Sequence, residues 1–129
     1  MATTTYTLEE AQGVLARKLN QRVWELLDKV GRRPEENEEM IQAAHASLYH
    51  WSQIGTVLNV QRGQWLLSRV YAVLGVPAAV RHYAEACWTL TEREGFTGFD
   101  YAYACEAMAR AWAVNENNEQ CNHWFQRAQ

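Results

Sequence analysis

Apolar residues return every three or four positions along most of the chain, which is the spacing of one face of an α-helix. A first helix is expected over about 7–31, with Thr7 and Glu10 spaced as a capping box at its start and Gly31 at its end. Its apolar stripe consists of Leu8, Ala11, Leu15, Leu19, Val23, Leu26 and Val30.

The same periodicity predicts five further helices, over about 36–53, 59–74, 77–94, 99–114 and the remainder of the chain. Asn59 is expected to cap the third helix and Asp100 the fifth. The second helix should bury Met40, Ala43, Ala44, Ser47, Leu48 and Trp51. Its first turns carry Glu35, Glu36, Glu38 and Glu39, where negative charge is favoured by the helix dipole.

The stretch Gly75-Val76-Pro77 forms the sharpest corner in this pattern. Glycine ends helices because it adopts the left-handed conformation without strain, and proline is well suited to the first helical position. The corner therefore predicts that one helix ends at Gly75 and the next begins at Pro77.

A shift of 41 residues carries Arg69–Val73 onto Arg110–Val114, and the opposite shift carries Trp65 onto Trp24. The same shift carries helix starts onto helix starts, which indicates an internal repeat. Repeats near this length are typical of stacked helical hairpins. We therefore expect one domain, 1–129, built from three hairpins over about 7–53, 60–94 and 99–128.

The stretch Trp65-x-Leu67…Tyr71-x-x-x-Gly75, followed by Ala79-x-x-x-Tyr83-x-x-Ala86, resembles the tetratricopeptide repeat. Three features depart from that family: the period is longer than its roughly 34 residues, Leu67 precedes serine rather than glycine, and the second-helix residues come one place early. The resemblance implies an all-α, right-handed superhelix of three antiparallel hairpins, about six helices, from a divergent bacterial branch.

In the repeats that this chain resembles, the first helix of each hairpin lines a concave groove that binds peptides or other partners. The positions that match in the first hairpin are Gln21, Trp24 and Asp28. In the other two hairpins they are Arg62, Trp65, Arg69, Tyr103, Glu106 and Arg110. Arginine forks beside indoles would suit a carboxylate-bearing peptide or an acidic small molecule. The competing interpretation places Trp65 in the core and the arginines in ordinary ion pairs.

Composition narrows the classes of function. The net charge of −3 argues against a nucleic-acid partner, because phosphate binding relies on clustered Lys and Arg. No apolar run approaches the roughly 20 residues of a membrane span, and no signal peptide is visible, so we expect a cytoplasmic protein without a membrane partner. Cys87, Cys105 and Cys121 form no CxxC pair and are expected to be reduced thiols.

The histidines are the natural candidates for a metal site or acid–base chemistry, and they are His45, His50, His82 and His123. Their spacing fits no metal motif, so no metal and no cofactor is expected, although convergence of His50, His82 and Cys87 between helices stays open.

No set of acid, base and nucleophile falls on one face, so we do not expect an enzyme. The favoured hypothesis is a non-catalytic module that binds a protein or peptide. The alternative is a small-ligand or metal-binding protein that uses His, Arg and Trp.

The last helix carries Trp124 and Phe125 on an apolar stripe that no further helix follows in this sequence. An uncovered aromatic patch is typical of an interface. We therefore expect a homodimer through the last hairpin, with truncation of a longer protein as the rival explanation.

Overall fold

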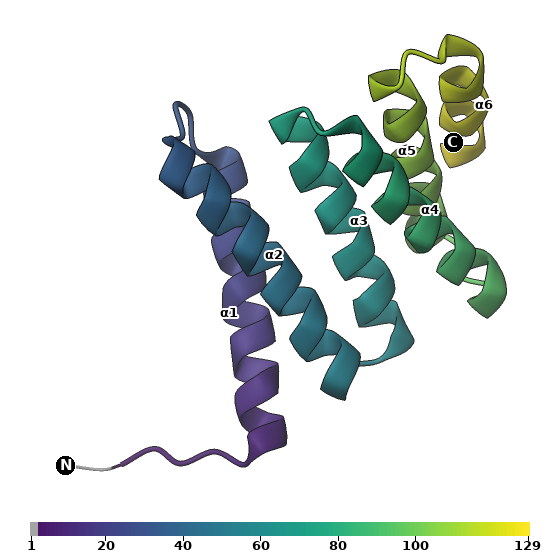
Figure 1. Ribbon diagram of the computed structural model, residues 1–129. Helices are drawn as coiled ribbons and strands as arrows, with labels where there is room; N and C mark the ends of the chain where they lie inside the picture. Colours follow the sequence, from purple (N-terminus) through teal and green to yellow (C-terminus); the bar gives the residue numbers. More distant parts are fainter. Residues whose placement is uncertain (1–2) are drawn as a thin grey trace. The chain divides into compact units, whose positions relative to one another are not determined.

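A computed structural model describes residues 3–129, and over this range the chain forms helices and no strand (Figure 1). The all-α prediction and the number of helices are confirmed. The chain divides into two compact units, one ending at Val60 and the other covering Gln61–Gln129. The helices are α1 (Leu8–Asp28), α2 (Pro34–Ile54), α3 (Val57–Leu74), α4 (Pro77–Glu94), α5 (Phe99–Val114) and α6 (Asn118–Ala128).

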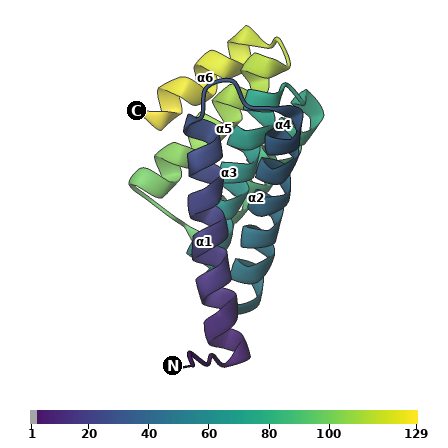
Figure 2. The ribbon, with the colours of Figure 1, turned by 90° about the vertical axis from the view of Figure 1, so that its left-hand side faces the viewer.

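The first unit is built on an antiparallel pair, with α1 and α2 side by side in both Figure 1 and Figure 2. The Ser47 hydroxyl donates a hydrogen bond to the Ala16 carbonyl oxygen at 2.8 Å, across the middle of the pair. Nearer the connecting loop, the Arg22 guanidinium donates to both carboxylate oxygens of Glu39 at 2.7 and 3.0 Å. These contacts fix the register of the two helices, with Met40 fully buried between them.

The buried face of α1 differs from the predicted stripe. Leu8, Leu15 and Val30 are exposed. Gly13 and Ala16 are buried instead, one turn apart, and such small residues allow a neighbouring backbone to approach closely, as the Ser47 bond to Ala16 shows. Val30 lies beyond the end of the helix at Asp28. The pattern of large apolar residues was therefore a wrong guide to the N-terminal half of this face.

Side chains close the starts of both helices in the first unit. At α1 the capping box is confirmed, since the Glu10 amide donates to Thr7 Oγ1 at 3.1 Å and the Thr7 amide to Glu10 Oε1 at 3.3 Å. At α2 the Arg33 amide donates to Glu36 Oε1 at 3.0 Å. Lys29 also pairs with this carboxylate. The ammonium of Lys29 and the Arg33 amide hold the pKa of Glu36 at about 2, below its usual value of 4.5.

In the second unit, the corner between α3 and α4 forms as predicted. Gly75 adopts a left-handed conformation, with φ of 73°, and the Val76 amide donates back to the Tyr71 carbonyl oxygen at 3.0 Å. Pro77 is the first residue of α4. Tyr71 and Tyr83 stack across the corner at 5.8 Å between ring centroids, which holds the two helices together.

Two predicted caps are wrong. Helix α3 begins earlier, and the Asn59 amide donates to Thr56 Oγ1 at 3.4 Å while the Thr56 amide donates to Asn59 Oδ1 at 3.1 Å. Thr56 therefore takes the capping place, and Asn59 reciprocates from inside the helix. At α5 the capping residue is Gly98, and the Asp100 carboxylate is turned to Arg62 instead.

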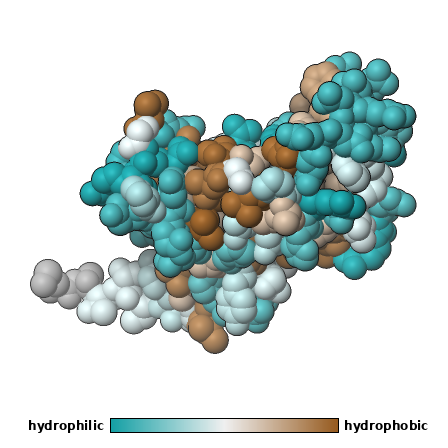
Figure 3. Space-filling view, turned by 45° about the horizontal axis from the view of Figure 1, so that its top comes forward, coloured by the Kyte–Doolittle hydropathy of each residue, from teal (hydrophilic) through white to brown (hydrophobic). Residues whose placement is uncertain are grey.

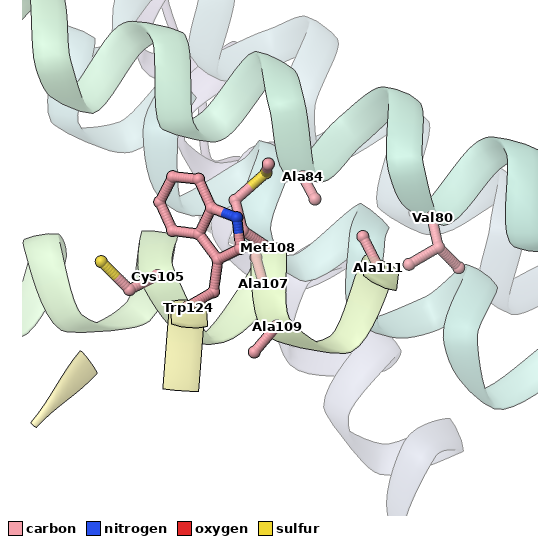
Figure 4. Close-up of a cluster of buried hydrophobic side chains, with 8 residues drawn as sticks. All are labelled: Val80, Ala84, Cys105, Ala107, Met108, Ala109, Ala111 and Trp124. Atoms are coloured by element: carbon pink, nitrogen blue, oxygen red, sulfur yellow. The ribbon is translucent and has the colours of Figure 1, made fainter. Parts of the chain in front are cut away.

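The second unit packs around alanines. Because α5 presents small side chains on several sides, it contacts both α4 and α6. Figure 4 shows the indole of Trp124 beside Met108, with Val80 and Ala84 contributed by α4. The buried cluster consists of Val80, Ala84, Cys105, Ala107, Met108, Ala109, Ala111 and Trp124.

The surface is mixed in character. In the view of Figure 3, brown hydrophobic residues stand among teal hydrophilic ones, and several large apolar side chains are exposed, among them Tyr49, Phe99 and Phe125. None of the helices in residues 3–129 combines the length and the apolar character needed to pass through a bilayer.

Substitution of Gly75 tests the corner. No atom lies within 4 Å of a Cβ added at this position, so Gly75→Ala should cost about 1 kcal/mol of unfolding free energy through backbone strain alone. Gly75→Asn should cost less, because asparagine tolerates the left-handed region. Urea denaturation measures both, and equal losses for the two variants would contradict this account.

Glu36 gives the fold a pH dependence. Its pKa is lowered in the folded chain, so its contribution is complete above about 4.5 and is lost as the pH falls towards about 2. Glu36→Gln should therefore be less stable at pH 7 and should lose less stability between pH 4.5 and 2. Urea midpoints across this range measure the effect, with Glu35→Gln, an exposed residue in the same turn, as the control. Superimposable profiles for the wild type and Glu36→Gln would show that the interpretation is wrong.

Candidate functional site

A buried glutamine at the start of α3 positions the candidate site. Gln61 is fully buried, and its Nε2 donates at 3.0 Å to Thr91 Oγ1 on α4 and at 3.0 Å to the Asp100 carbonyl oxygen on α5. The Thr91 hydroxyl in turn donates to the Cys87 carbonyl oxygen at 2.7 Å. A buried polar group is costly unless it is hydrogen-bonded, so this network aligns the three helices at one end of the second unit.

Next along α3, Arg62 reaches Asp100 at the start of α5. Arg62 Nε lies 3.1 Å from Asp100 Oδ1, and the second guanidinium bond is longer, at 3.5 Å. The Arg62 side chain is still 57% exposed, so much of it remains open to solvent. The ion pair between Arg62 and Asp100 links α3 to α5 and leaves the arginine accessible to solvent.

One turn further, aromatic rings from both helices meet. The ring centroids of Trp65 and Tyr103 lie 5.2 Å apart at a tilt of 39°. Tyr103 also stacks with Phe99 at 6.4 Å, and Phe99 is 82% exposed. Trp65 packs against the buried cluster as well, as the competing interpretation predicted. Its ring also forms the inner end of a row that leads to the exposed Phe99, and its role in binding stays a prediction.

About one further turn along α3 and α5, this surface carries two arginines, Arg69 and Arg110. Arg110 pairs with Glu106, one turn earlier on α5. Burial lowers the pKa of Arg110, and the positive charge of Arg69 on α3 lowers it further, while Glu106 raises it. Only 21% of the Arg110 side chain is exposed, and its Nη1 is buried with no hydrogen-bond partner among residues 3–129. A desolvated cation with an unused donor attracts an anion.

The second unit thus brings together the six site residues predicted from the second and third hairpins. We call this surface the α3–α5 face; it comprises Arg62, Trp65, Arg69, Phe99, Asp100, Tyr103, Glu106 and Arg110. The three positions predicted from the first hairpin lie on α1 in the first unit, with Gln21 and Asp28 exposed and Trp24 half-buried.

The contacts across the face follow a shorter offset than the sequence repeat. Arg62 and Asp100 are 38 positions apart, and the pair Trp65 and Tyr103 has the same separation. The repeat shift of 41 matches each residue to its counterpart in the next hairpin, whereas contacts join neighbours about one turn away. For this reason Phe99 and Asp100 were not predicted as site residues, although an aromatic residue at the start of α5 is visible in the sequence.

The histidines and cysteines considered for catalysis or metal binding differ in burial within residues 3–129. No three His, Cys, Asp or Glu side chains there are placed to hold a metal ion. Burial raises the pKa of the Cys87 thiol to about 12 and also raises that of Cys105, which disfavours the nucleophilic thiolate. Burial lowers the pKa of His45, while His82 and His123 are exposed.

The predicted patch for self-association is wrong for one of its two residues. Trp124 is only 9% exposed and lies in the core between α4 and α5, where its ring meets that of Trp88 at 4.7 Å. Phe125, the next residue, is 55% exposed. Self-association stays a prediction, and of these two side chains Phe125 alone is available for it.

Comparisons with known proteins give no match: no protein-family model, no curated protein and no solved structure matches this chain. The resemblance to the tetratricopeptide repeat therefore stays a prediction.

A double-mutant cycle on Arg62→Ala and Asp100→Ala tests whether Arg62 is free to meet a partner. Because the arginine is exposed, the coupling energy should be below about 1 kcal/mol and should fall as salt is added. Urea denaturation at low and high sodium chloride measures it. A coupling of about 3 kcal/mol that is insensitive to salt would instead mean that Arg62 is a structural residue.

Proposed function

We propose that the chain is a non-catalytic interaction module whose α3–α5 face binds a peptide segment of a partner protein. The observation that carries this proposal is the state of Arg110, a largely buried cation with an unused N–H donor beside a second arginine. A carboxylate from a partner would accept from that donor and offset the repulsion between the two cations.

The row of aromatic rings beside the arginines indicates which residue of the partner peptide should lie next to its carboxylate. Phe99 and Tyr103 offer an exposed apolar surface that ends at Trp65. Aromatic and arginine residues dominate binding energy at interfaces, because they combine large contact area with directed hydrogen bonds. The partner segment suited to this face carries an acidic residue next to an apolar or aromatic one.

We further propose that the hairpins form a right-handed superhelix of the tetratricopeptide kind. Support comes from the repeat in the sequence and from the corner at Gly75-Val76-Pro77. Within the second unit, the constant separation of residues paired between α3 and α5 adds to it. In this arrangement the α3–α5 face belongs to the concave side, where such repeats hold their partners.

A peptide display library selected on the immobilised protein tests the proposal. Enriched peptides should carry Asp or Glu beside an apolar residue, and replacing that acid by its amide should weaken binding. The variant Trp65→Ala/Arg69→Ala should bind selected peptides about 30-fold more weakly or not at all, measured by fluorescence anisotropy.

The matched control is Arg81→Ala/His82→Ala, which removes the same number of side chains from an exposed part of α4. Circular dichroism and urea denaturation accompany each variant, because Trp65 also packs against the core. If the double variant is unstable, Arg69→Ala alone carries the test. Unchanged binding in a folded Arg69→Ala variant, or enrichment of peptides without acidic residues, would reject the proposal.

A further inference from the structure

A second surface of the second unit holds an arginine in a corner of aromatic rings. The rings of Trp88 on α4 and Trp124 on α6 lie 4.7 Å apart at 73°, so they form two nearly perpendicular walls. The Arg127 guanidinium carbon sits 4.9 Å from the first ring centroid and 4.8 Å from the second. Arg127 Nη2 also donates a hydrogen bond to the Tyr101 hydroxyl oxygen at 3.0 Å.

A hollow of about 690 Å³ opens beside this corner. Its walls include the corner residues together with Glu92 and Phe96, from the end of α4 and the loop that follows. Its volume lies within the roughly 300–1,000 Å³ of ligand sites. The hollow therefore has room for a segment of another molecule next to the ring that Arg127 covers.

We propose that the corner is a recognition site for an arginine side chain of a partner peptide. In the absence of the partner, Arg127 fills this site. Each contact of Arg127 is one that an incoming guanidinium can take over: two indole faces for cation–π stacking and one hydroxyl acceptor for an N–H. The Glu92 carboxylate gives the hollow a negative charge of the sign that a cation requires.

Displacement of Arg127 is physically reasonable because it lies in the last turn of α6 and is itself exposed. Once displaced, its guanidinium passes into water, while the partner's guanidinium regains the same stacking. The exchange in the corner is then nearly balanced, and the net affinity comes from the rest of the partner segment in the hollow. The apparent affinity for the partner is therefore the intrinsic affinity multiplied by the fraction of molecules in which Arg127 leaves the corner open.

The corner formed by Trp88 and Trp124 differs from the α3–α5 face in the charge of the ligand that it would bind. The α3–α5 face offers arginine donors to a carboxylate, whereas the corner offers indole faces and a carboxylate to a cation. Failure of one proposal leaves the other standing.

Titration with N-acetyl-arginine methylamide, followed through the indole N–H signals of Trp88 and Trp124 by NMR, tests the inference. If Arg127 fills the corner in about nine molecules of ten, Arg127→Ala should bind the probe about tenfold more tightly than the wild type. Arg81→Ala is the matched control, because Arg81 stacks on Trp112 at 4.7 Å outside the hollow, and it should bind like the wild type. Equal affinity in Arg127→Ala and the wild type would overturn the inference.

Two further comparisons define the ligand. In the Arg127→Ala background, Tyr101→Phe should weaken binding of the arginine probe about three- to tenfold, through loss of one hydrogen bond. Tetramethylammonium, which has no hydrogen-bond donor, should bind more weakly than the arginine probe and should be insensitive to Tyr101→Phe. Tetramethylammonium binding as tight as that of the arginine probe would overturn the assignment to guanidinium.

If Arg127→Ala destabilises α6, Arg127→Gln replaces it, since glutamine is longer than alanine but has no positive charge to stack on the indoles. Urea denaturation and the Trp112 indole signal report the integrity of each variant. A folded Arg127→Gln variant that binds the arginine probe no better than the wild type would count against the inference.

Discussion

The candidate site depends on one buried side chain, Gln61. Its amide joins α3 to a hydroxyl on α4 and to a carbonyl on α5, and its Oε1 is left without a hydrogen-bond partner among residues 3–129. A helix shifted by one turn would leave further polar atoms unpaired in the core, at a cost of about 1–3 kcal/mol each. This constraint fixes the register in which Arg62 meets Asp100 and Trp65 meets Tyr103.

How far the sequence predicts this structure depends on the range of the interaction. Local rules placed the capping box at Thr7, the corner at Gly75 and the start of α4, because each depends on residues within one helical turn. The same rules failed at Asp100, whose carboxylate could cap its own helix but binds Arg62 on a distant one. Periodicity failed in the N-terminal half of α1, where Gly13 and Ala16 are buried rather than the large residues of the predicted stripe. In the C-terminal half it held, since Val23 and Leu26 are buried as predicted.

The candidate sites show the same division. Register within the repeat picked out arginine and aromatic residues on α3 and α5 that do lie near one another in the second unit. It gave no information on Gln61 or on the corner formed by Trp88 and Trp124, because these arise from contacts between helices of different sequence. On α6 the sequence showed an apolar stripe, but which of its aromatic residues is buried depends on where α4 and α5 lie.

Helix α5 serves both surfaces without making them one site. Tyr101 and Tyr103 are separated by about 200° around the helix, so the first reaches Arg127 while the second meets Trp65. The buried residues of α5 are mostly alanines, together with Cys105 and Met108, so few long side chains connect the two surfaces. This separation would allow one helix to contribute to both of the binding surfaces that we propose, one for an anion and one for a cation.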